Sequence, residues 1–515
     1  MALKNRWLAL TGLTLSVLVI GLDTTVLNVA LPTLAADTGA STGQLQWIVD
    51  SYAVVYAAAM LPAGLLGDRF GRRRLLICGL AVFLGGSVLA TLVDTPGPLI
   101  AARTVMGLGA ALVMPLALSV IAVLFHGAEQ TKALAVLTAG MSLGMPLGPL
   151  VSGWLLEHFW WGSVFVVNIP LIALGILACA LLLPETRDAT APRIDPLSTA
   201  LGILGLGTLI YGVIEAPAHG LTAAHTLGPV GAGALLLTAL VLRERRQRHP
   251  MVDLDLLRNP AFRWNTVYLV LGIFVFMGLM FVLPQYLQAV QHHDALGTGV
   301  RLMPLMAGMI VVAKAVPPLT ARYGTRPLIV AGLLLMGAAL LAGSTTGPHT
   351  GYAFTALWMT ATGLGVGFVM VPAVDSALAT LPSGKEGTGS ALSATLRQVG
   401  GAIGIALLGS LLTQVFTDRL DTRALPGDAA DSARESVIAA QAVAARLDLP
   451  HLARSAEAAF TDGMTAVLLL CGITGLAAAV LAAFTLPDDR PAPAVHPRTP
   501  DVTQTLPTVA DGRRQ

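Results

Sequence analysis

Long apolar stretches, separated by short polar segments, recur along the whole chain. A transmembrane helix needs about 20 consecutive, mainly apolar residues, and this length predicts fourteen spanning helices. They are expected near residues 8–34, 47–66, 75–93, 98–125, 133–157, 162–183, 196–215, 225–242, 264–290, 299–320, 327–343, 351–378, 387–416 and 462–485. The chain is therefore predicted to be an all-α polytopic membrane protein.

The composition agrees with this pattern. Of 515 residues, 55% are hydrophobic and 12% are charged, whereas soluble domains carry about 25% charged residues. The net charge of +2 is small, and the basic residues form no single patch, so a nucleic-acid partner is not expected. Cys78, Cys179 and Cys471 lie far apart without CxxC spacing, which argues against a disulfide framework or a metal site.

The basic residues predict the orientation. They collect in alternate short loops and predict two cytoplasmic termini in the cell inner (plasma) membrane. These residues are Lys4, Arg6, Arg69, Arg72, Arg73, Arg74, Lys132, Arg187, Arg193, the "RERRQRHP" run at 243–250, Arg322, Arg326 and Lys385. The segment 417–461 is then expected outside the cell, and the Pro-rich tail 487–515 is expected to be disordered in the cytoplasm.

A short internal repeat divides the chain. "DRFGRRRL" at 68–75 follows the second predicted span, and "ARYGTRPL" at 321–328 follows the tenth. Internal similarity of this kind is typical of transporters built from two related halves, and it predicts a 6+2+6 arrangement of the fourteen helices. The predicted domains are an N-terminal six-helix bundle, linkers with two inserted helices, a C-terminal six-helix bundle that includes 417–461, and the tail. Their boundaries are 1–183, 184–250, 251–486 and 487–515.

Arg103 and Asp23 are two of the charged residues that stand inside predicted spans. Arg103 costs at least ~2.5 kcal/mol inside a membrane, so a partner in the bundle interior is expected; snorkelling to the surface is the alternative. Asp23 lies in the middle of the first span, within "GLDTTVLNVALP" at 21–32. An acid that is buried and faces Arg103 can load and lose a proton near neutral pH. A purely structural Asp, bonded to neighbouring helices, is the alternative.

Two glycine-containing motifs complete the pattern. "GLLGDRFGRRRLL" at 64–76 combines a tight turn with an acid and four arginines, and a simple positively charged anchor explains neither the acid nor the glycine spacing. "GMSLGMPLGPLVSG" at 140–153 carries glycines four residues apart on one helical face, which lets helices approach closely. The residues of these motifs are Gly64, Asp68, Arg69, Gly71, Arg72 and Arg73, and Gly140, Gly144, Gly148, Pro149 and Gly153.

Together these motifs resemble the major facilitator superfamily, and in particular its 14-span drug:proton antiporters. Residues 22–32 match the first span of that family nearly throughout, and "RTVMGLGA" at 103–110 matches its fourth. The resemblance implies a major-facilitator-type fold with Asp23 as proton carrier near Arg103. It also implies that the 64–76 loop latches the two halves, with Asp68 as its acid, and that the 140–153 glycines mark an antiporter, although Ser152 stands where a glycine is usual.

The expected function is proton-coupled export of lipophilic, drug-like or antibiotic molecules, which are cationic in some cases. A proton-coupled transporter of a dedicated metabolite, lipid or sugar is the alternative, and a sensor or scaffold would need soluble domains that are not evident. No P-loop, HExxH or dinucleotide motif is found. The chain is thus expected to be no enzyme, to need no cofactor besides the proton gradient, and to work as a monomer among membrane lipids.

The substrate cleft is predicted from helix position alone. Asp50 is either a second acidic site or a solvated residue at the outer mouth, Lys314 is expected to have an acidic or carbonyl partner or to meet anionic cargo, and Arg397 faces the cleft or the 64–76 loop. The candidate cleft residues are Asn28, Asp50, Tyr52, Tyr56, Phe276, Met280, Gln288, Lys314, Arg397 and Gln398.

Overall fold

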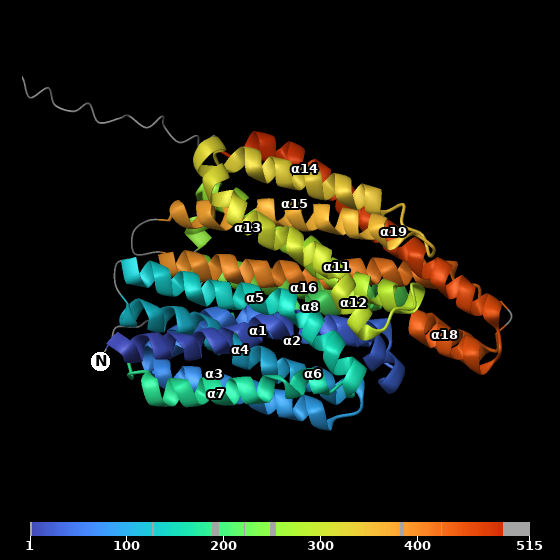
Figure 1. Ribbon diagram of the computed structural model, residues 1–515, viewed down its shortest axis with the longest axis horizontal. Coiled ribbons are helices and arrows are strands. Elements are labelled where there is room, and N and C mark those ends of the chain that lie inside the picture. The colour runs from blue at the N-terminus through green and yellow to red at the C-terminus, as the bar shows by residue number, and fades with distance from the viewer. Residues whose placement is uncertain are drawn as a thin grey trace, which may run out of the picture.

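A computed structural model describes residues 3–125, 128–187, 195–220, 222–247, 254–381, 386–423 and 425–487. These residues are helical almost throughout, and no strand occurs among them. Figure 1 shows the helices running side by side along the long axis of the molecule. The predicted all-α fold is therefore confirmed. The tail predicted at 487–515 lies, from residue 488 onward, outside the residues that the structure describes.

Three groups of helices pack in chain order. Helices α1 to α7 pack on one another and form the N-terminal group. Its members are α1 (Leu3–Thr38), α2 (Thr42–Phe70), α3 (Arg72–Leu92), α4 (Pro96–Leu124), α5 (Ala128–His158), α6 (Ser163–Val166) and α7 (Asn168–Leu182). The inserted pair follows, in which α8 and α10 pack on each other while α8 also contacts α2 and α16. It consists of α8 (Pro196–Ile214), the short α9 (Ala216–His219) and α10 (Ala224–Arg246).

The C-terminal group contains the remaining helices. Its core is formed by α11, α13, α14, α15, α16 and α19, which pack on one another. The bounds are η1 (Leu254–Arg258), α11 (Pro260–Gln285), the π-helical η2 (Tyr286–Val290), α12 (Ala295–Arg301), α13 (Met303–Tyr323), α14 (Thr325–Gly343), α15 (Tyr352–Ala379), α16 (Glu386–Arg419), α17 (Gly427–Glu435), α18 (Val437–Arg446) and α19 (Pro450–Thr485).

Local sequence explains where several helices begin. Ser41 caps α2 through a capping box, because its hydroxyl accepts from the Gln44 backbone N–H while Gln44 reaches back to the Ser41 N–H. Asn259 caps α11 and Asp195 caps α8, and each is followed by a proline at the first helical position, where a missing N–H costs nothing. These polar caps lie at the ends of the apolar stretches.

Twelve helices of the described chain are long and apolar enough to cross a membrane. Both long helices of the inserted pair are among them. Two further helices, α2 with 29 residues and α5 with 31, are as long but are not among the twelve. The structure therefore shows a multi-pass membrane architecture, and the fourteen-span count stays a prediction.

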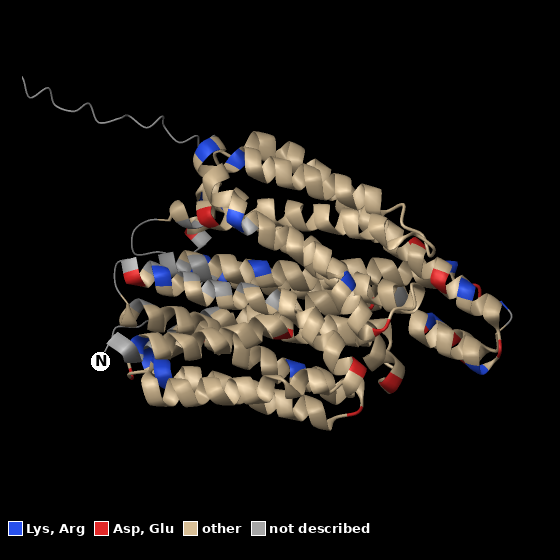
Figure 2. Ribbon diagram, viewed as in Figure 1, with Lys and Arg blue, Asp and Glu red and all other residues tan. Residues whose placement is uncertain are grey.

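The two ends of the bundle differ in charge. One end carries the start of α1, the α2–α3 turn and the ends of α10 and α13, and Figure 2 shows Lys and Arg gathered there. We call it the arginine-rich end. The segment 417–461, expected only as an outer loop with helix-like character, lies at the opposite end, where α17 and α18 form a helical pair beside an extended α19. Its alanine-rich sequence favours helix.

Candidate functional site

Asp23 and Arg103 meet inside the N-terminal group. Arg103 Nη1 of α4 donates to Asp23 Oδ2 of α1 at 2.6 Å, and both side chains are almost completely buried. The second carboxylate oxygen of Asp23 accepts from Asn168 Nδ2 of α7 at 3.2 Å. A buried charge is tolerated only when it is paired and hydrogen-bonded, and this arrangement supplies both conditions for the carboxylate.

The guanidinium of Arg103 has further partners. Its Nε donates to the backbone carbonyl of Ile48 in α2 at 3.2 Å. The guanidinium carbon also lies 4.3 Å from the centre of the Tyr52 ring, a distance at which a cation is attracted to an aromatic face. Arg103 therefore connects α1, α2 and α4 at one buried point. Any change in its pairing alters the contacts among these three helices.

Asp50 is the second acid of this region. It lies on α2 and is fully buried, so the alternative of a solvated residue at the outer mouth is wrong. Neither of its carboxylate oxygens has a hydrogen-bond partner among the described residues. An ionised carboxylate in such surroundings is very costly, which makes Asp50 chemically different from the paired Asp23.

The glycines of α5 set the position of α1. An added Cβ at Gly144 would lie 2.6 Å from the backbone nitrogen of Leu22, and one at Gly148 would lie 2.9 Å from that of Val26. Gly140 meets Thr14 of α1 in the same way. Pro149 is buried in the same helix. Only residues without a side chain allow this approach, so the glycine stripe holds the helix that carries Asp23.

Gly153 contacts a different partner. A Cβ at this position would lie 2.7 Å from the carbonyl oxygen of Ala295 in α12. Gly299 of α12 in turn faces the backbone of Pro149. The same helix α5 thus packs on α1 through its first glycines and on the C-terminal group through its last, at the end opposite the arginines.

Hydrogen bonds between the groups are found in the same region. Gln288 Nε2 donates to the Val29 carbonyl at 2.8 Å, and Gln46 Nε2 lies 3.3 Å from the carbonyl of Ile405. Thr42 at the start of α2 donates to the Glu435 carbonyl of α17 at 2.8 Å. Gln288, predicted as a cleft residue, instead ties the two groups together here.

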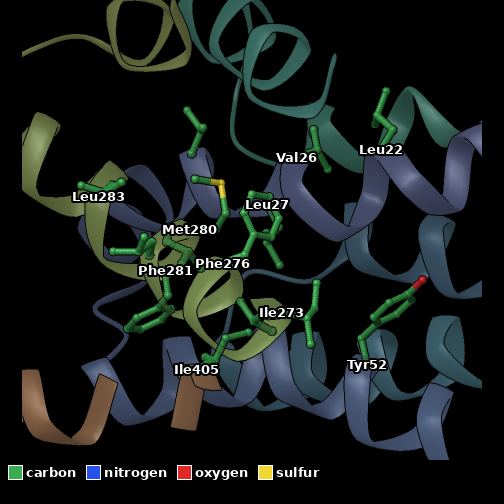
Figure 3. Close-up of a cluster of buried hydrophobic side chains, with 14 of the residues drawn as sticks. Leu22, Val26, Leu27, Tyr52, Ile273, Phe276, Met280, Phe281, Leu283 and Ile405 are labelled. Carbon is green, nitrogen blue, oxygen red and sulfur yellow. The ribbon is translucent and has the colours of Figure 1, made fainter. Parts of the chain in front are cut away.

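Two other predicted cleft residues lie in packed surroundings. Phe276 and Met280 of α11 are both fully buried, and Figure 3 shows them among apolar side chains that include Leu27 of α1. The expectation that they line an open cleft is not met in this conformation, because α1 and α11 are pressed together there. Tyr52 is buried against Arg103, and its hydroxyl has no partner among the described residues.

Three of the remaining cleft candidates meet one another, and the other two lie elsewhere. Tyr56 of α2 forms a hydrogen bond with Gln398 and lies near the guanidinium of Arg397, both on α16, so these three residues meet at the boundary between the N- and C-terminal groups. Asn28 is buried on α1, and its Oδ1 lacks a described partner. Lys314 is exposed on α13, with no acid or carbonyl bonded to it among the described residues. The expected partner is therefore not found, because α13 turns this side chain outward.

The 64–76 loop, at the α2–α3 turn, contacts other residues of the N-terminal group. Gly71 has φ = +110°, a backbone conformation that favours glycine. Glu185 beyond α7 accepts from the Arg73 backbone N–H at 3.2 Å and lies 3.6 Å from Arg74 Nε. The Arg73 side chain bonds the Ala180 carbonyl, while the side chain of Asp68 lies outside the described part. Gly64, Arg69 and Arg72 flank this turn.

Two residues of these sites, Asn168 and Glu185, were not predicted from the sequence. Asn168 is fully buried beside Asp23. A lone amide inside the apolar run "FVVNIP" at 165–170 was the available signal, since a buried polar side chain needs partners. For Glu185, the available signal was its position as the first acid after an apolar helix. No group of three or more metal-ligating side chains occurs among the described residues.

Comparisons with known proteins agree with this architecture. Residues 13–405 match the Major Facilitator Superfamily. The tetracenomycin C resistance and export protein of Streptomyces glaucescens is 32% identical over 504 residues, which are 95% of this chain and 94% of that protein. The multidrug efflux pump LfrA of Mycolicibacterium smegmatis is 34% identical over 484 residues, 93% of this chain and 95% of that pump.

A solved structure shares the fold. A bacterial homologue of the human lysosomal transporter Spinster superposes with a TM-score of 0.65 at 19% identity, covering 96% of this chain and 100% of that one. The buried ion pair, the glycine stripe and the helical architecture thus stand in a chain whose relatives are drug and antibiotic exporters. The protein belongs to the major facilitator superfamily of membrane transporters and is not an enzyme.

Proposed function

We propose that this protein is a proton-coupled antiporter that exports lipophilic, drug-like or antibiotic molecules from the cytoplasm by alternating access. The observation that carries the proposal is the buried pair of Asp23 and Arg103 at 2.6 Å, placed on a helix that the glycines of α5 hold at close range. The names of its relatives, an antibiotic export protein and a multidrug efflux pump, support the choice of cargo.

The proposed arrangement has fourteen spans, counted as six, two and six. The N-terminal group, the inserted pair and the C-terminal group support this division, with α2 and α5 added to the twelve apolar helices. Since Lys and Arg favour the cytoplasmic side, the arginine-rich end faces the cytoplasm of the plasma membrane. Both termini then lie inside, and α17 and α18 lie outside.

Asp23 is the proposed proton carrier. A proton on Asp23 removes the charge that holds Arg103, so the guanidinium must turn to other acceptors such as the Ile48 carbonyl, which it already contacts. Because Arg103 connects α1, α2 and α4, this change alters the packing of the helices that face the C-terminal group. Loss of the proton restores the pair and the first arrangement.

The driving force is sufficient for efflux. One proton that enters through ~100 mV gains about 2.3 kcal/mol, and one pH unit adds about 1.36 kcal/mol. For a neutral cargo and one proton, this supports a gradient of roughly several hundredfold. A monocation exchanged for one proton uses the pH term alone.

Cargo recognition is assigned to the boundary between the two large groups. Tyr56, Arg397 and Gln398 meet there, and Asp50 lies on the same helix as Tyr56. Asp50 has no described partner for its carboxylate, so a cationic cargo that reaches it supplies the missing charge. Separation of α1 from α11 would expose Phe276 and Met280, which offer the flexible apolar surface suited to varied lipophilic ligands.

Transport in everted membrane vesicles tests the proposal. Cargo addition should dissipate an imposed pH gradient with the wild type and with Asp37→Asn, a matched control because Asp37 is an exposed acid on the same helix. Asp23→Asn should abolish this proton flux while it still binds cargo, measured by fluorescence titration of the purified protein. If Asp23→Asn dissipates the gradient as fast as the wild type, Asp23 is not the proton carrier.

A further inference from the structure

Two adjoining cavities lie along the inserted helix α8. The first has a volume of about 400 Å³ and is lined by α2, α4 and the first two turns of α8. The second, of about 250 Å³, lies further along the same three helices. Ile203 of α8 lines both, so the two cavities adjoin at this residue, and together we call them the α8 groove.

We propose that the α8 groove binds one acyl chain of an anionic phospholipid whose headgroup lies at the arginine-rich end. This proposal rests on the proposed function only for the side of the membrane on which that headgroup lies. It goes beyond transport chemistry, because none of the residues that line the groove belongs to the Asp23 site.

The first cavity fits within one leaflet. It extends from Pro196 to Ile203 on α8 and from Ala59 to Leu66 on α2, which at 1.5 Å per residue is about 10 Å along each helix. Half of the hydrocarbon core of a bilayer is about 15 Å thick. The second cavity continues along α8 to Thr208 and along α2 to Trp47, so an acyl chain that enters at the arginine-rich end passes through the first cavity and extends into the second.

The walls of the first cavity suit hydrocarbon. They are built from small apolar side chains on facing helices, such as Ala59, Ala63, Ala111 and Ala200, with larger aliphatic residues around them. Next to the second cavity, which Val54 also lines, α8 packs on α2 and α16 through Val54, Leu206 and Ile210. A hydrocarbon chain that lies in this space makes dispersion contacts with these walls.

Two arginines stand where the headgroup would lie. Arg243 Nε bonds Asp195 Oδ2 at 2.6 Å, and Asp195 directly precedes Pro196 at the mouth of the groove. That bond uses one of the five guanidinium donors, which leaves the Nη groups for a phosphate. Arg69 is exposed and lies one turn beyond Leu66 of the groove wall, on the same side of α2.

The acids near this mouth are largely occupied. Asp195 accepts from Arg243, Gln247 and the Leu197 backbone. Glu244 is buried and bonded to Ser198 at 2.5 Å. Basic residues directly beyond a membrane helix attract anionic headgroups, so this end of the groove complements a phosphatidylglycerol-like lipid better than a zwitterionic one.

Photolabelling tests the site. The purified protein is placed in phosphatidylcholine nanodiscs that contain a trace of phosphatidylglycerol or phosphatidylcholine with a diazirine in the acyl chain, and labelled peptides are identified by mass spectrometry. Peptides of α8 from 196 to 208 should take up the anionic probe about fivefold more than the zwitterionic probe. Unlabelled phosphatidylglycerol should compete for this labelling, and unlabelled phosphatidylcholine should not.

A matched pair of variants locates the ligand. Ala200→Trp fills the groove from an exposed wall position and should reduce the anionic labelling to the zwitterionic level. Leu235→Trp adds the same side chain on an exposed face of α10 outside the groove and should leave labelling unchanged. Equal labelling by both probes, or displacement of the lipid by a lipophilic cationic cargo instead of by phosphatidylglycerol, would overturn the proposal without bearing on Asp23.

Discussion

Gln288 of η2 donates its amide hydrogen to the backbone carbonyl of Val29 in α1 at 2.8 Å, across 259 positions of the chain. Only three residues later, Gln291 makes its bonds within the C-terminal group, to the Tyr286 hydroxyl at 2.9 Å and to the Pro348 carbonyl at 2.6 Å. Of these two nearby glutamines, Gln288 therefore joins the two large groups and Gln291 does not.

Replacing Gln288 by Leu should favour separation of the groups at the end opposite the arginines. The lost hydrogen bond is worth about 1 kcal/mol, which is about a fivefold change in a conformational equilibrium. Distances between spin labels on α5 and α12, measured by electron-electron resonance, should show a larger open population. Gln291→Leu is the control, and an equal shift in both variants would contradict a specific role for Gln288.

Asn168→Leu should impair transport without loss of the Asp23–Arg103 pair. The substitution removes the donor to Asp23 Oδ1, and leaving that buried acceptor unpaired costs about 1–3 kcal/mol. We expect cargo-driven proton flux to fall severalfold at equal protein content of the vesicles. Asn265→Leu, which removes another buried amide that bonds Ala261 and Ser376, should affect flux less; equal losses would indicate a merely structural effect.

Gly144→Ala should destabilise the N-terminal group. The new Cβ would lie 2.6 Å from the Leu22 backbone nitrogen, and overpacking of this kind costs about 1–3 kcal/mol. The apparent melting temperature in detergent should therefore fall. Gly85→Ala is the matched control, because nothing lies within 4 Å of its added Cβ; this variant should be neutral or slightly more stable, since alanine favours helix. A similar fall in both would contradict the packing argument.

The contact between Asp195 and Arg243 should be lost at low pH. The hydrogen bond from Arg243 holds the pKa of Asp195 well below its usual value, with bonds from Ser198 and Gln247 acting in the same direction and burial opposing them. Since the folded pKa is lower than the unfolded value near 3.9, the stabilisation is complete above about pH 4 and is lost as the pH falls through the folded pKa. Arg243 is partly exposed, so solvent screening reduces the size of this stabilisation.

The apparent melting temperature should decrease between pH 5 and pH 3 by more in the wild type than in Asp195→Asn, which has already lost the charge. Asp255→Asn removes the acid of an exposed ion pair with Arg258, in which both side chains are more than three-quarters exposed, and serves as the control. If Asp195→Asn keeps the full pH dependence of the wild type, another carboxylate is responsible.

The pairing of Asp23 with Arg103 shows how far sequence reasoning extends. A charged residue deep in an apolar stretch needs a partner, and the chain offered an acid in the first span, so the contact was predictable. Asn168 was not predicted, because an uncharged amide does not demand one particular partner. Asp50 was left with two alternatives, since position near a helix start does not reveal whether neighbouring helices cover a side chain.

Apolar length, polar caps and loop arginines are local properties, so the sequence alone predicts the helices, their approximate ends and the basic character of one end. Which way each helix turns depends on tertiary packing. Lys314 faces outward while Phe276 and Met280 are buried against α1, and the groove beside α8 exists only where three helices meet. The rotation of each helix and its contacts depend on the packing of residues far apart in the chain. The hydropathy of a segment carries no information about that packing.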